Sequence, residues 1–247
     1  MKTINQIRTA LEKEEFYLVY MPTMDLKTRQ CVGAEALIRW NSNGENIPPD
    51  EFIPRIENTP LSGLITYWVI EQVAKELKEW LDNTEGVHVG INVPPELIGR
   101  GGLEYAAIKA GLMDSVDKII LEVTERGFPD QLALNTLGET KDRIKVAIDD
   151  FGTGDANMMQ LSRMRADIIK LDKFFIDHIT DSNPQPGIVH GLVAFAKAMG
   201  FDVIAEGVET QIQYDYLTGL HVNMAQGWFF SKPLRLTDFL NFASQPH

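Results

Sequence analysis

The chain has 247 residues, a formal net charge of −12 and a hydrophobic content of 44%. These values fit a single α/β domain, residues 1–247, with enough apolar residues to bury a sizeable core. The acidic balance disfavours binding of a nucleic acid polymer, because that mode needs clustered Lys and Arg on the surface. No apolar run reaches the roughly 18 residues of a membrane span, so we expect no membrane contact by the domain itself.

The cysteine content and the first residues bear on the cellular compartment. The lone Cys31 lies in an apolar run, where we expect a small core residue rather than a nucleophile. The opening segment is charged and helix-like and has no signal-peptide core. We therefore expect a cytoplasmic location. The domain can still belong to a longer sensory protein whose other segments anchor it at the inner membrane.

The first predicted elements are two extended segments, residues 17–26 and 31–40, joined by a turn at residues 27–30. Residues 61–81 then carry apolar side chains at helical spacing, which predicts a long helix packed on the core. The side chains expected on its buried face are Leu61, Leu64, Ile65, Trp68, Val69, Val73, Leu77 and Leu81.

After this helix, short β-rich runs alternate with helical segments. The predicted strands are residues 87–92, 118–125, 145–150, 167–172, 202–207 and 221–227. The predicted helices between them are residues 95–110, 130–143, 156–164, 187–199 and 210–218. Such alternation is typical of βαβ units and therefore of a parallel sheet.

Polar side chains stand at the end of one predicted strand after another. They are Glu35, Asn92, Glu122, Asp149, Asp150, Lys170 and Glu206. In a barrel these ends form the C-terminal face, where loops assemble active sites, so we expect the side chains to converge on one cavity. Burying several unpaired carboxylates would be costly, which implies a cation in that cavity.

The candidate metal ligands are all oxygen donors: Glu35, Asn92, Glu122, Asp149 and Asp150. Mg²⁺ or Mn²⁺ suits such a set better than Zn²⁺, and five donors exceed what one ion that retains water would use. We therefore expect two divalent ions, with Ca²⁺ binding but inhibiting. Two metals roughly 3.5–4 Å apart can activate a water in a phosphoryl displacement, which predicts phosphodiester hydrolysis. Lys170 would hold or help deprotonate that water, or offset transition-state charge.

Each residue also has a structural interpretation. A carboxylate after a strand, such as Asp150 or Glu209, is often a helix N-cap, and Lys170 alone could pair with a neighbouring acid. Gln226 could simply bond backbone groups, and His88 is expected to be a core residue. Capping does not explain the whole set of strand-end residues together, however.

The strand-end residues also fall into longer motifs. Residues 35–39 are Glu-Ala-Leu-Ile-Arg, and residues 149–154 are Asp-Asp-Phe-Gly-Thr-Gly. The other motifs are Asn92, residues 122–125 (Glu-Val-Thr-Glu), residues 170–172 (Lys-Leu-Asp), residues 206–209 (Glu-Gly-Val-Glu) and residues 226–227 (Gln-Gly). In this order they resemble the EAL family of bacterial cyclic di-GMP phosphodiesterases, and the resemblance covers almost the whole chain.

The resemblance implies a modified TIM-type (β/α)8 barrel with one antiparallel strand, and hydrolysis of cyclic di-GMP to the linear dinucleotide pGpG. It assigns metal coordination to Glu35, Asn92, Glu122, Asp149 and Asp150. It assigns water activation to Lys170 and Glu206, and to Glu125 the bracing of the loop at residues 150–154. It places Arg39, Gln226 and Glu209 at the substrate. It also implies a homodimer through the loop and helix after Asp150.

Three departures separate the chain from the common family pattern. Met21 stands where glutamine is frequent, Pro94 where serine is common, and residues 155–158 are Asp-Ala-Asn-Met instead of Tyr-Ser-Ser-Leu. None removes a candidate ligand. They bear on guanine contacts, loop dynamics and dimer coupling.

Two alternatives from other classes stay open. A catalytically silent cyclic di-GMP receptor would use the same pocket to regulate a partner, but the complete set of ligands argues against it. An enolase-type lyase or isomerase also places carboxylate-bound Mg²⁺ and a lysine base at barrel strand ends. The adjacent aspartates and the motif order argue against that chemistry.

Overall fold

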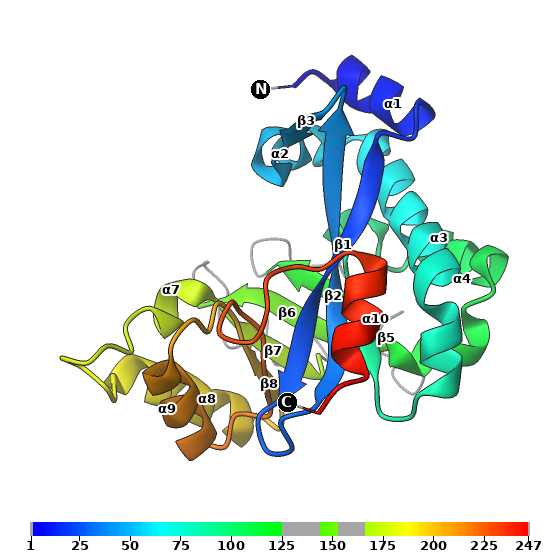
Figure 1. The fold of residues 1–247 in the computed structure, drawn as a ribbon. Helices are drawn as coiled ribbons and strands as arrows, with labels where there is room; N and C mark the ends of the chain where they lie inside the picture. The colour runs from blue at the N-terminus through cyan, green and yellow to red at the C-terminus, as the bar shows by residue number, and fades with distance from the viewer. Residues whose placement is uncertain (1, 125–143, 153–165, 247) are drawn as a thin grey trace.

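The computed structural model describes residues 2–124, 144–152 and 166–246, and a closed barrel lies at its centre (Figure 1). The barrel strands are β1 (Phe16–Asp25), β2 (Cys31–Ser42), β4 (His88–Asn92), β5 (Ile119–Thr124), β6 (Lys145–Phe151), β7 (Ile168–Leu171), β8 (Asp202–Ala205) and β9 (Met224–Ala225). Around the barrel their order is β1-β9-β8-β7-β6-β5-β4-β2, and the β1–β2 pairing closes the ring. β1 runs antiparallel to both neighbours, and the other pairs are parallel. The predicted (β/α)8-type barrel with one antiparallel strand is confirmed.

Like the pairing of β8 with β9, the seam between β1 and β9 is two residues long. Only Met24 with Ala225 and Asp25 with Met224 are in register there, and the predicted strand at residues 221–227 is reduced to two residues. Further up β1, a bridge between Tyr20 and Leu234 continues the closure.

β1 and β2 continue beyond the barrel as a long hairpin (Figure 1). β3 (Glu45–Ile47) pairs with the end of β2, and α1 (Ile4–Glu12), η1 (Pro49–Glu51) and α2 (Ile53–Ile56) gather around it. A separate apolar cluster fixes this extension and contains Phe16, Trp40 and Phe52. The Phe16 and Trp40 rings lie 5.4 Å apart, and the Trp40 and Phe52 rings 5.6 Å apart.

The long helix α3 (Pro60–Asn83) confirms the helix predicted at residues 61–81. It begins where the Thr59 hydroxyl accepts a hydrogen bond from the Leu61 N–H at 3.3 Å. The predicted burial of Leu64 is wrong, because this side chain is 52% exposed. The buried face also includes Ser62 and Thr66, so it is turned away from Leu64.

The remaining helices cover the outside of the barrel. They are η2 (Pro95–Leu97), α4 (Gly102–Ala110), η3 (Met113–Lys118), α7 (Lys173–Ile176), α8 (Gly187–Ala198), α9 (Gln211–Gly219) and α10 (Leu236–Ala243). The helices predicted at residues 187–199 and 210–218 are confirmed. The continuous helix predicted at residues 95–110 is wrong, because Gly99 and Gly101 adopt φ values of 72° and 77°, which interrupt a right-handed helix. The helices predicted at residues 130–143 and 156–164 lie outside the described residues.

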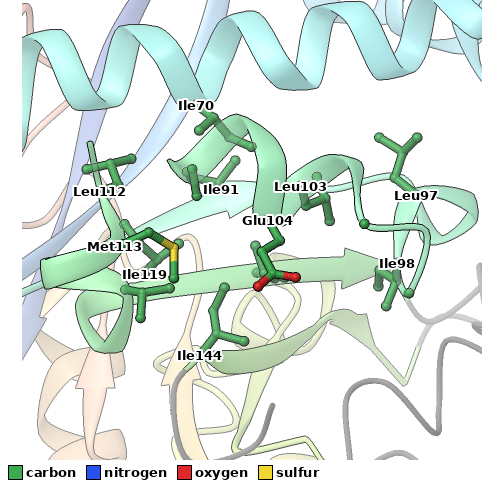
Figure 2. A pocket seen from close by; sticks show the side chains of 15 residues that line it. Ile70, Ile91, Leu97, Ile98, Leu103, Glu104, Leu112, Met113, Ile119 and Ile144 are labelled. Carbon is green, nitrogen blue, oxygen red and sulfur yellow. The ribbon is translucent and has the colours of Figure 1, made fainter. Parts of the chain in front are cut away.

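A cavity of about 140 Å³ lies between α3, α4 and the outer face of β4 and β5, and Figure 2 shows its lining side chains. Its walls are aliphatic and include Ile70, Ile91, Leu103 and Leu121, and Glu104 is the charged side chain among the described lining residues. This cavity lies outside the barrel and lacks convergent polar groups, so it is not the candidate site. Among the described helices, none is both long enough and apolar enough to cross a membrane.

Candidate active site

The barrel interior has an apolar floor with a ring of polar side chains above it. Ile120, Ala147, Ile168 and Ile204 form a buried cluster, and Met224 packs against it. Two residues further along the same strands or strand ends stand Glu122, Asp149, Lys170, Glu206 and Gln226. Residues two apart share one face of a strand, so this pattern places the polar ring directly above the floor, at the C-terminal strand ends.

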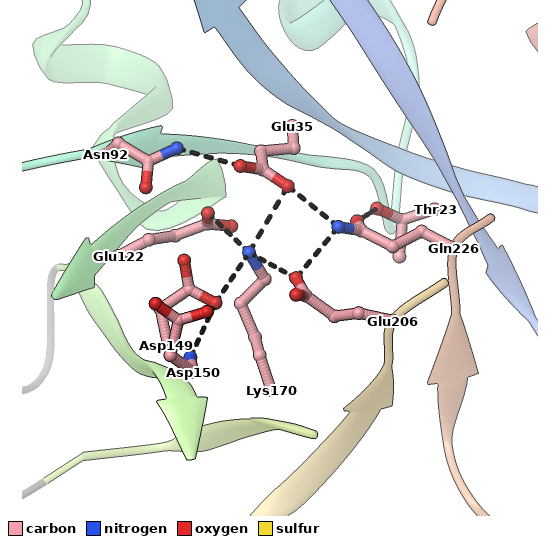
Figure 3. A network of polar contacts seen from close by, with 9 residues as sticks. All are labelled: Thr23, Glu35, Asn92, Glu122, Asp149, Asp150, Lys170, Glu206 and Gln226. Carbon is pink, nitrogen blue, oxygen red and sulfur yellow. Dashed lines mark hydrogen bonds and ion pairs between the residues drawn. The ribbon is translucent and has the colours of Figure 1, made fainter. Parts of the chain in front are cut away.

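Lys170 lies at the centre of the polar ring (Figure 3). Its side chain is fully buried, and its Nζ lies 2.7 Å from Glu206 Oε1 and 2.8 Å from Glu122 Oε2. Glu35 Oε2 and Asp149 Oδ1 are each 3.2 Å away. Burial alone would lower the pKa of Lys170, but the surrounding carboxylates raise it well above its usual range. Lys170 is therefore a fixed cation that compensates the buried acids.

Two of these carboxylates respond differently to burial. Burial raises the pKa of Glu122 well above its usual range, although Lys170 opposes the change. Burial also acts to raise the pKa of Glu35, but Lys170 and two amide donors lower it overall. Asn92 Nδ2 donates to Glu35 Oε1 at 2.8 Å, and Gln226 Nε2 donates to Glu35 Oε2 at 2.7 Å. Glu35 is thus held as an anion, and Asn92 can offer its amide oxygen to a cation.

Gln226 joins Glu35 to a further acid. Its Nε2 also donates to Glu206 Oε1 at 2.9 Å, while its Oε1 accepts from the Thr23 hydroxyl at 3.4 Å. Burial raises the pKa of Glu206 to about 8, with Lys170 opposing and neighbouring acids adding to the rise. Thr23 is a functional residue that the sequence pattern did not predict. The signal that could have found it is a hydroxyl on the inward-facing side of a mostly apolar strand.

Asp149 and Asp150 both reach the site because β6 is irregular at its end. Adjacent residues of a regular strand point to opposite faces. Here the register with β7 shifts between Ile148 and Phe151, and Asp150 has a φ of 55°. The Asp150 N–H donates to Asp149 Oδ1 at 3.0 Å. Burial, then Asp149 and Asp172, raise the pKa of Asp150.

The acids form two groups whose oxygens lie within 4.8 Å of one another. One group is Glu35, Glu122 and Asp149, and the other is Asp149, Asp150 and Glu206. Asp149 belongs to both. These donors are carboxylate oxygens, which suit Mg²⁺ or Mn²⁺, and an aspartate that belongs to both groups could serve two adjacent ions. The residues present therefore fit a pair of divalent ions.

Two glycines make room for interior side chains. A Cβ on Gly90 would collide with Glu122 Oε1, so the glycine gives this carboxylate its space. At the other end of the interior, a Cβ on Gly33 would collide with the imidazole of His88. Burial, with a contribution from Lys145, lowers the pKa of His88 to about 4. His88 is therefore a neutral residue of the barrel interior at pH 7.

Two other candidate residues, Arg39 and Glu209, lie outside the network around Lys170. Arg39 is half-buried, and burial lowers its pKa. Glu209 is exposed and pairs with Lys173 at 3.0 Å instead of contacting the central acids. Glu125 lies outside the described residues, as do residues 153–165, on which the expected dimer interface depends.

Comparisons with known proteins agree with this geometry. The chain matches the family model of the EAL domain over residues 4–233. It is 33% identical over 254 residues to "Probable cyclic di-GMP phosphodiesterase PdeB" of Escherichia coli (strain K12), an alignment that covers 98% of this chain and 47% of PdeB. The chain thus spans about half the length of the curated relatives it matches.

Two solved structures are similar over almost the whole chain. The EAL enzyme Bd1971 in its cAMP and cyclic-di-GMP bound form has a TM-score of 0.89 and 31% identity, and covers 97% of this chain and 68% of its own. The PaMucR phosphodiesterase in complex with c-di-GMP has a TM-score of 0.85 and 29% identity, and covers 96% of this chain and 98% of its own. With the family model matched over residues 4–233, the chain belongs to the EAL domain family.

Proposed function

We propose that this domain hydrolyses cyclic di-GMP to linear pGpG with two divalent metal ions. The observation that carries the proposal is the sharing of Asp149 between two carboxylate groups at metal-ligand spacing. Similarity to the PaMucR phosphodiesterase, which was solved with c-di-GMP, supports the choice of substrate.

The ions, Mg²⁺ or Mn²⁺, would be held by Glu35, Asn92, Glu122, Asp149 and Asp150. When bound, they would activate a water molecule and stabilise the negative charge that develops on the phosphate oxygens. The hydrolysis itself forms a bond between the water oxygen and phosphorus and breaks the bond from phosphorus to the ribose 3′ oxygen. The 3′ oxygen takes up a proton, and the product keeps a 5′ phosphate.

Lys170 and Glu206 would have different roles at the attacking water. The four carboxylates around the Lys170 ammonium support a role as hydrogen-bond donor and cation. Glu206 suits proton acceptance, because a general base works best with a pKa near the operating pH, and burial raises the pKa of Glu206 to about 8. Gln226 would orient both Glu35 and Glu206 through its two donated hydrogen bonds.

Further parts of the proposal concern the substrate and the assembly. Arg39 would contact a substrate phosphate, with Gln226 and Glu209 close to the nucleotide, and Glu125 would brace the loop after Asp150. We propose a homodimer through that loop and the following helix. The domain would act in the cytoplasm as one unit of a longer signalling protein, without contact to nucleic acid polymers or lipid.

The test is incubation of the purified chain with cyclic di-GMP and Mg²⁺ or Mn²⁺, with products resolved by chromatography. We expect pGpG, no product in EDTA, and inhibition by Ca²⁺, whose larger and looser coordination positions water poorly. An intact substrate with tight binding in Ca²⁺ would favour the silent receptor. Absence of both turnover and binding would reopen the enolase-type alternative.

A further inference from the structure

The inner face of the β1–β2 hairpin continues above the carboxylates to a tyrosine and an arginine. Side chains alternate along a strand, and the paired residues Phe16 and Trp40 lie in the outer cluster. The next pair, Tyr17 and Arg39, therefore lies on the opposite face. That face also carries Glu35, four residues before Arg39.

A second arginine approaches the same tyrosine from the other side of β1. Tyr20 and Leu234 form an antiparallel bridge, with N–H to carbonyl distances of 2.8 Å in both directions. Tyr20 faces outward, since its hydroxyl donates to Glu76 of α3 at 2.8 Å, and Leu234 shares that face. Arg235 is the next residue, and its backbone is extended at φ −70° and ψ 158°. It therefore points to the inner face, where its guanidinium carbon lies 4.1 Å from the centre of the Tyr17 ring.

The result is a row across three neighbouring chain segments, Arg39, Tyr17 and Arg235, which we call the mouth row. Within the part of the chain that the structure describes, neither arginine has a carboxylate at ion-pair distance, although the charge of Glu35 acts on Arg39 from further away. The guanidinium of Arg39 donates to the backbone carbonyl of Ile38 at 2.9 Å. In a chain with 35 acidic and 23 basic residues, two guanidiniums that lie beside one ring and form no ion pair with a described carboxylate indicate a surface prepared for an external acceptor.

The distance between the mouth row and the carboxylates determines which part of the ligand the mouth row can contact. Arg39 follows Glu35 by four residues, which corresponds to about 13 Å along a strand. A phosphate that is cleaved at the carboxylates is therefore too deep to be the main partner of Arg235. The other half of a cyclic dinucleotide is the group that extends towards the mouth.

We propose that the mouth row binds the half of cyclic di-GMP that is not cleaved, with Arg235 and Tyr17 as specificity-determining residues; the inference rests on the proposed function. Arg235 donates from the edge of a guanidinium whose face is held by the Tyr17 ring. Its partner offers two adjacent acceptors, which are the oxygens of the second phosphate or O6 and N7 of a guanine. The tyrosine ring adds a surface on which a base can stack.

The experiment compares Arg235→Gln and Tyr17→Leu with the wild type on two substrates. On cyclic di-GMP, we expect KM to rise by about 10-fold or more, as for loss of a bidentate arginine contact, with kcat within about 2-fold. On bis(p-nitrophenyl) phosphate, which lacks guanine and a second phosphate, both variants should match the wild type. The matched control is Arg29→Gln, because Arg29 also lies over an aromatic ring, at 5.3 Å from Tyr214, but sits at the turn that ends β1.

Competition with cyclic di-AMP distinguishes the two candidate partners of Arg235, the guanine base and the second phosphate. If Arg235 contacts guanine, Arg235→Gln reduces the preference for cyclic di-GMP over cyclic di-AMP; if it contacts the second phosphate, affinity for both falls equally. If the wild type is active and both variants keep its KM for cyclic di-GMP, the role of the mouth row is refuted and the proposed function stands. The same holds if the variants lose as much activity on bis(p-nitrophenyl) phosphate as on cyclic di-GMP. An inactive wild type would overturn the proposed function instead, and the same variants would then be compared by Kd in Ca²⁺. Absence of binding there would overturn both.

Discussion

Replacing Lys170 by methionine tests whether its ammonium is the internal counter-ion of the metal-free site. Methionine keeps most of the aliphatic length but removes the charge that lies within 3.2 Å of Glu35, Glu122, Asp149 and Glu206. The variant therefore leaves three buried carboxylates and the partly buried Glu206 without their common partner. We expect the metal-free protein to lose a large part of its stability.

The size of the loss follows from the burial of the group. Removing one member of a buried ion pair costs about 3–5 kcal/mol, because the remaining charge is left uncompensated. For a domain of this length, 1 kcal/mol shifts Tm by roughly 2–4 °C, so the loss corresponds to roughly 6–20 °C. Proton uptake limits the cost, since burial already raises the pKa of Glu122 and Glu206. A carboxylate with a raised pKa in the folded state stabilises it at low pH, and this contribution is lost as pH rises through the folded pKa.

The assay is thermal unfolding in EDTA between pH 5 and pH 8, repeated with excess Mg²⁺. Lys170→Met should unfold well below the wild type at pH 8, approach it at pH 5, and gain more from Mg²⁺, which supplies the missing positive charge. The control is Lys173→Met, which removes exposed ion pairs to Asp177 at 2.7 Å and Glu209 at 3.0 Å and should cost about 1 kcal/mol at most. If the two variants had the same Tm in EDTA at pH 8, the assignment of Lys170 as internal counter-ion would be refuted.

Three further predictions concern single side chains. Glu35→Ala should abolish turnover of cyclic di-GMP while circular dichroism shows a folded domain, and near-wild-type turnover would contradict its assignment as a ligand. Thr23→Val should lower kcat by about 5-fold through loss of one hydrogen bond to Gln226, whereas Thr23→Ser should keep it; equal rates in steady-state assays would rule out positioning by this hydroxyl. Burial lowers the pKa of His88 from its usual 6.5 to about 4, so the folded state binds fewer protons than the unfolded state between these pH values. The free energy of unfolding therefore falls as pH drops from 6.5 to 4, by up to about 3 kcal/mol, and by less where water reaches the ring. His88→Gln should flatten this part of a Tm-against-pH curve, and an unchanged slope would count against the burial argument.

Strand alternation made most of the fold and the polar ring predictable. An apolar residue two positions before Glu122, Lys170 or Glu206 places each polar group above the floor, and this spacing is visible in the sequence. Gln226 carried the weakest signal, because its role depends on two carboxylates from other strands. Thr23 was missed for the same reason, since nothing local marks its partner.

Other features depend on backbone conformation or tertiary packing. Apolar spacing does not report the positive φ of Gly99 and Gly101, so the helix at residues 95–110 was predicted as continuous. The buried face of α3 is set by the elements packed against it, which is why Leu64 was misplaced. The approach of Arg235 to Tyr17 depends on a bridge between residues more than 200 positions apart, and no sequence pattern announces it.

The short pairing between β1 and β9 has a consequence for motion. A barrel opens most easily where the fewest backbone hydrogen bonds hold it, and here the two-residue strand β9 pairs over two residues with β1 and with β8. Thr23, Gln226 and Arg235 all lie along the seam between β1 and β9, so the seam is crossed by side chains of the site as well as by backbone. Amide hydrogen exchange should therefore be fast at Met24 and at Leu26, whose N–H donates across the seam to the Asn223 carbonyl at 3.1 Å, and it should slow when cyclic di-GMP occupies the mouth. Bound substrate would then reduce local opening at a seam that few backbone hydrogen bonds stabilise.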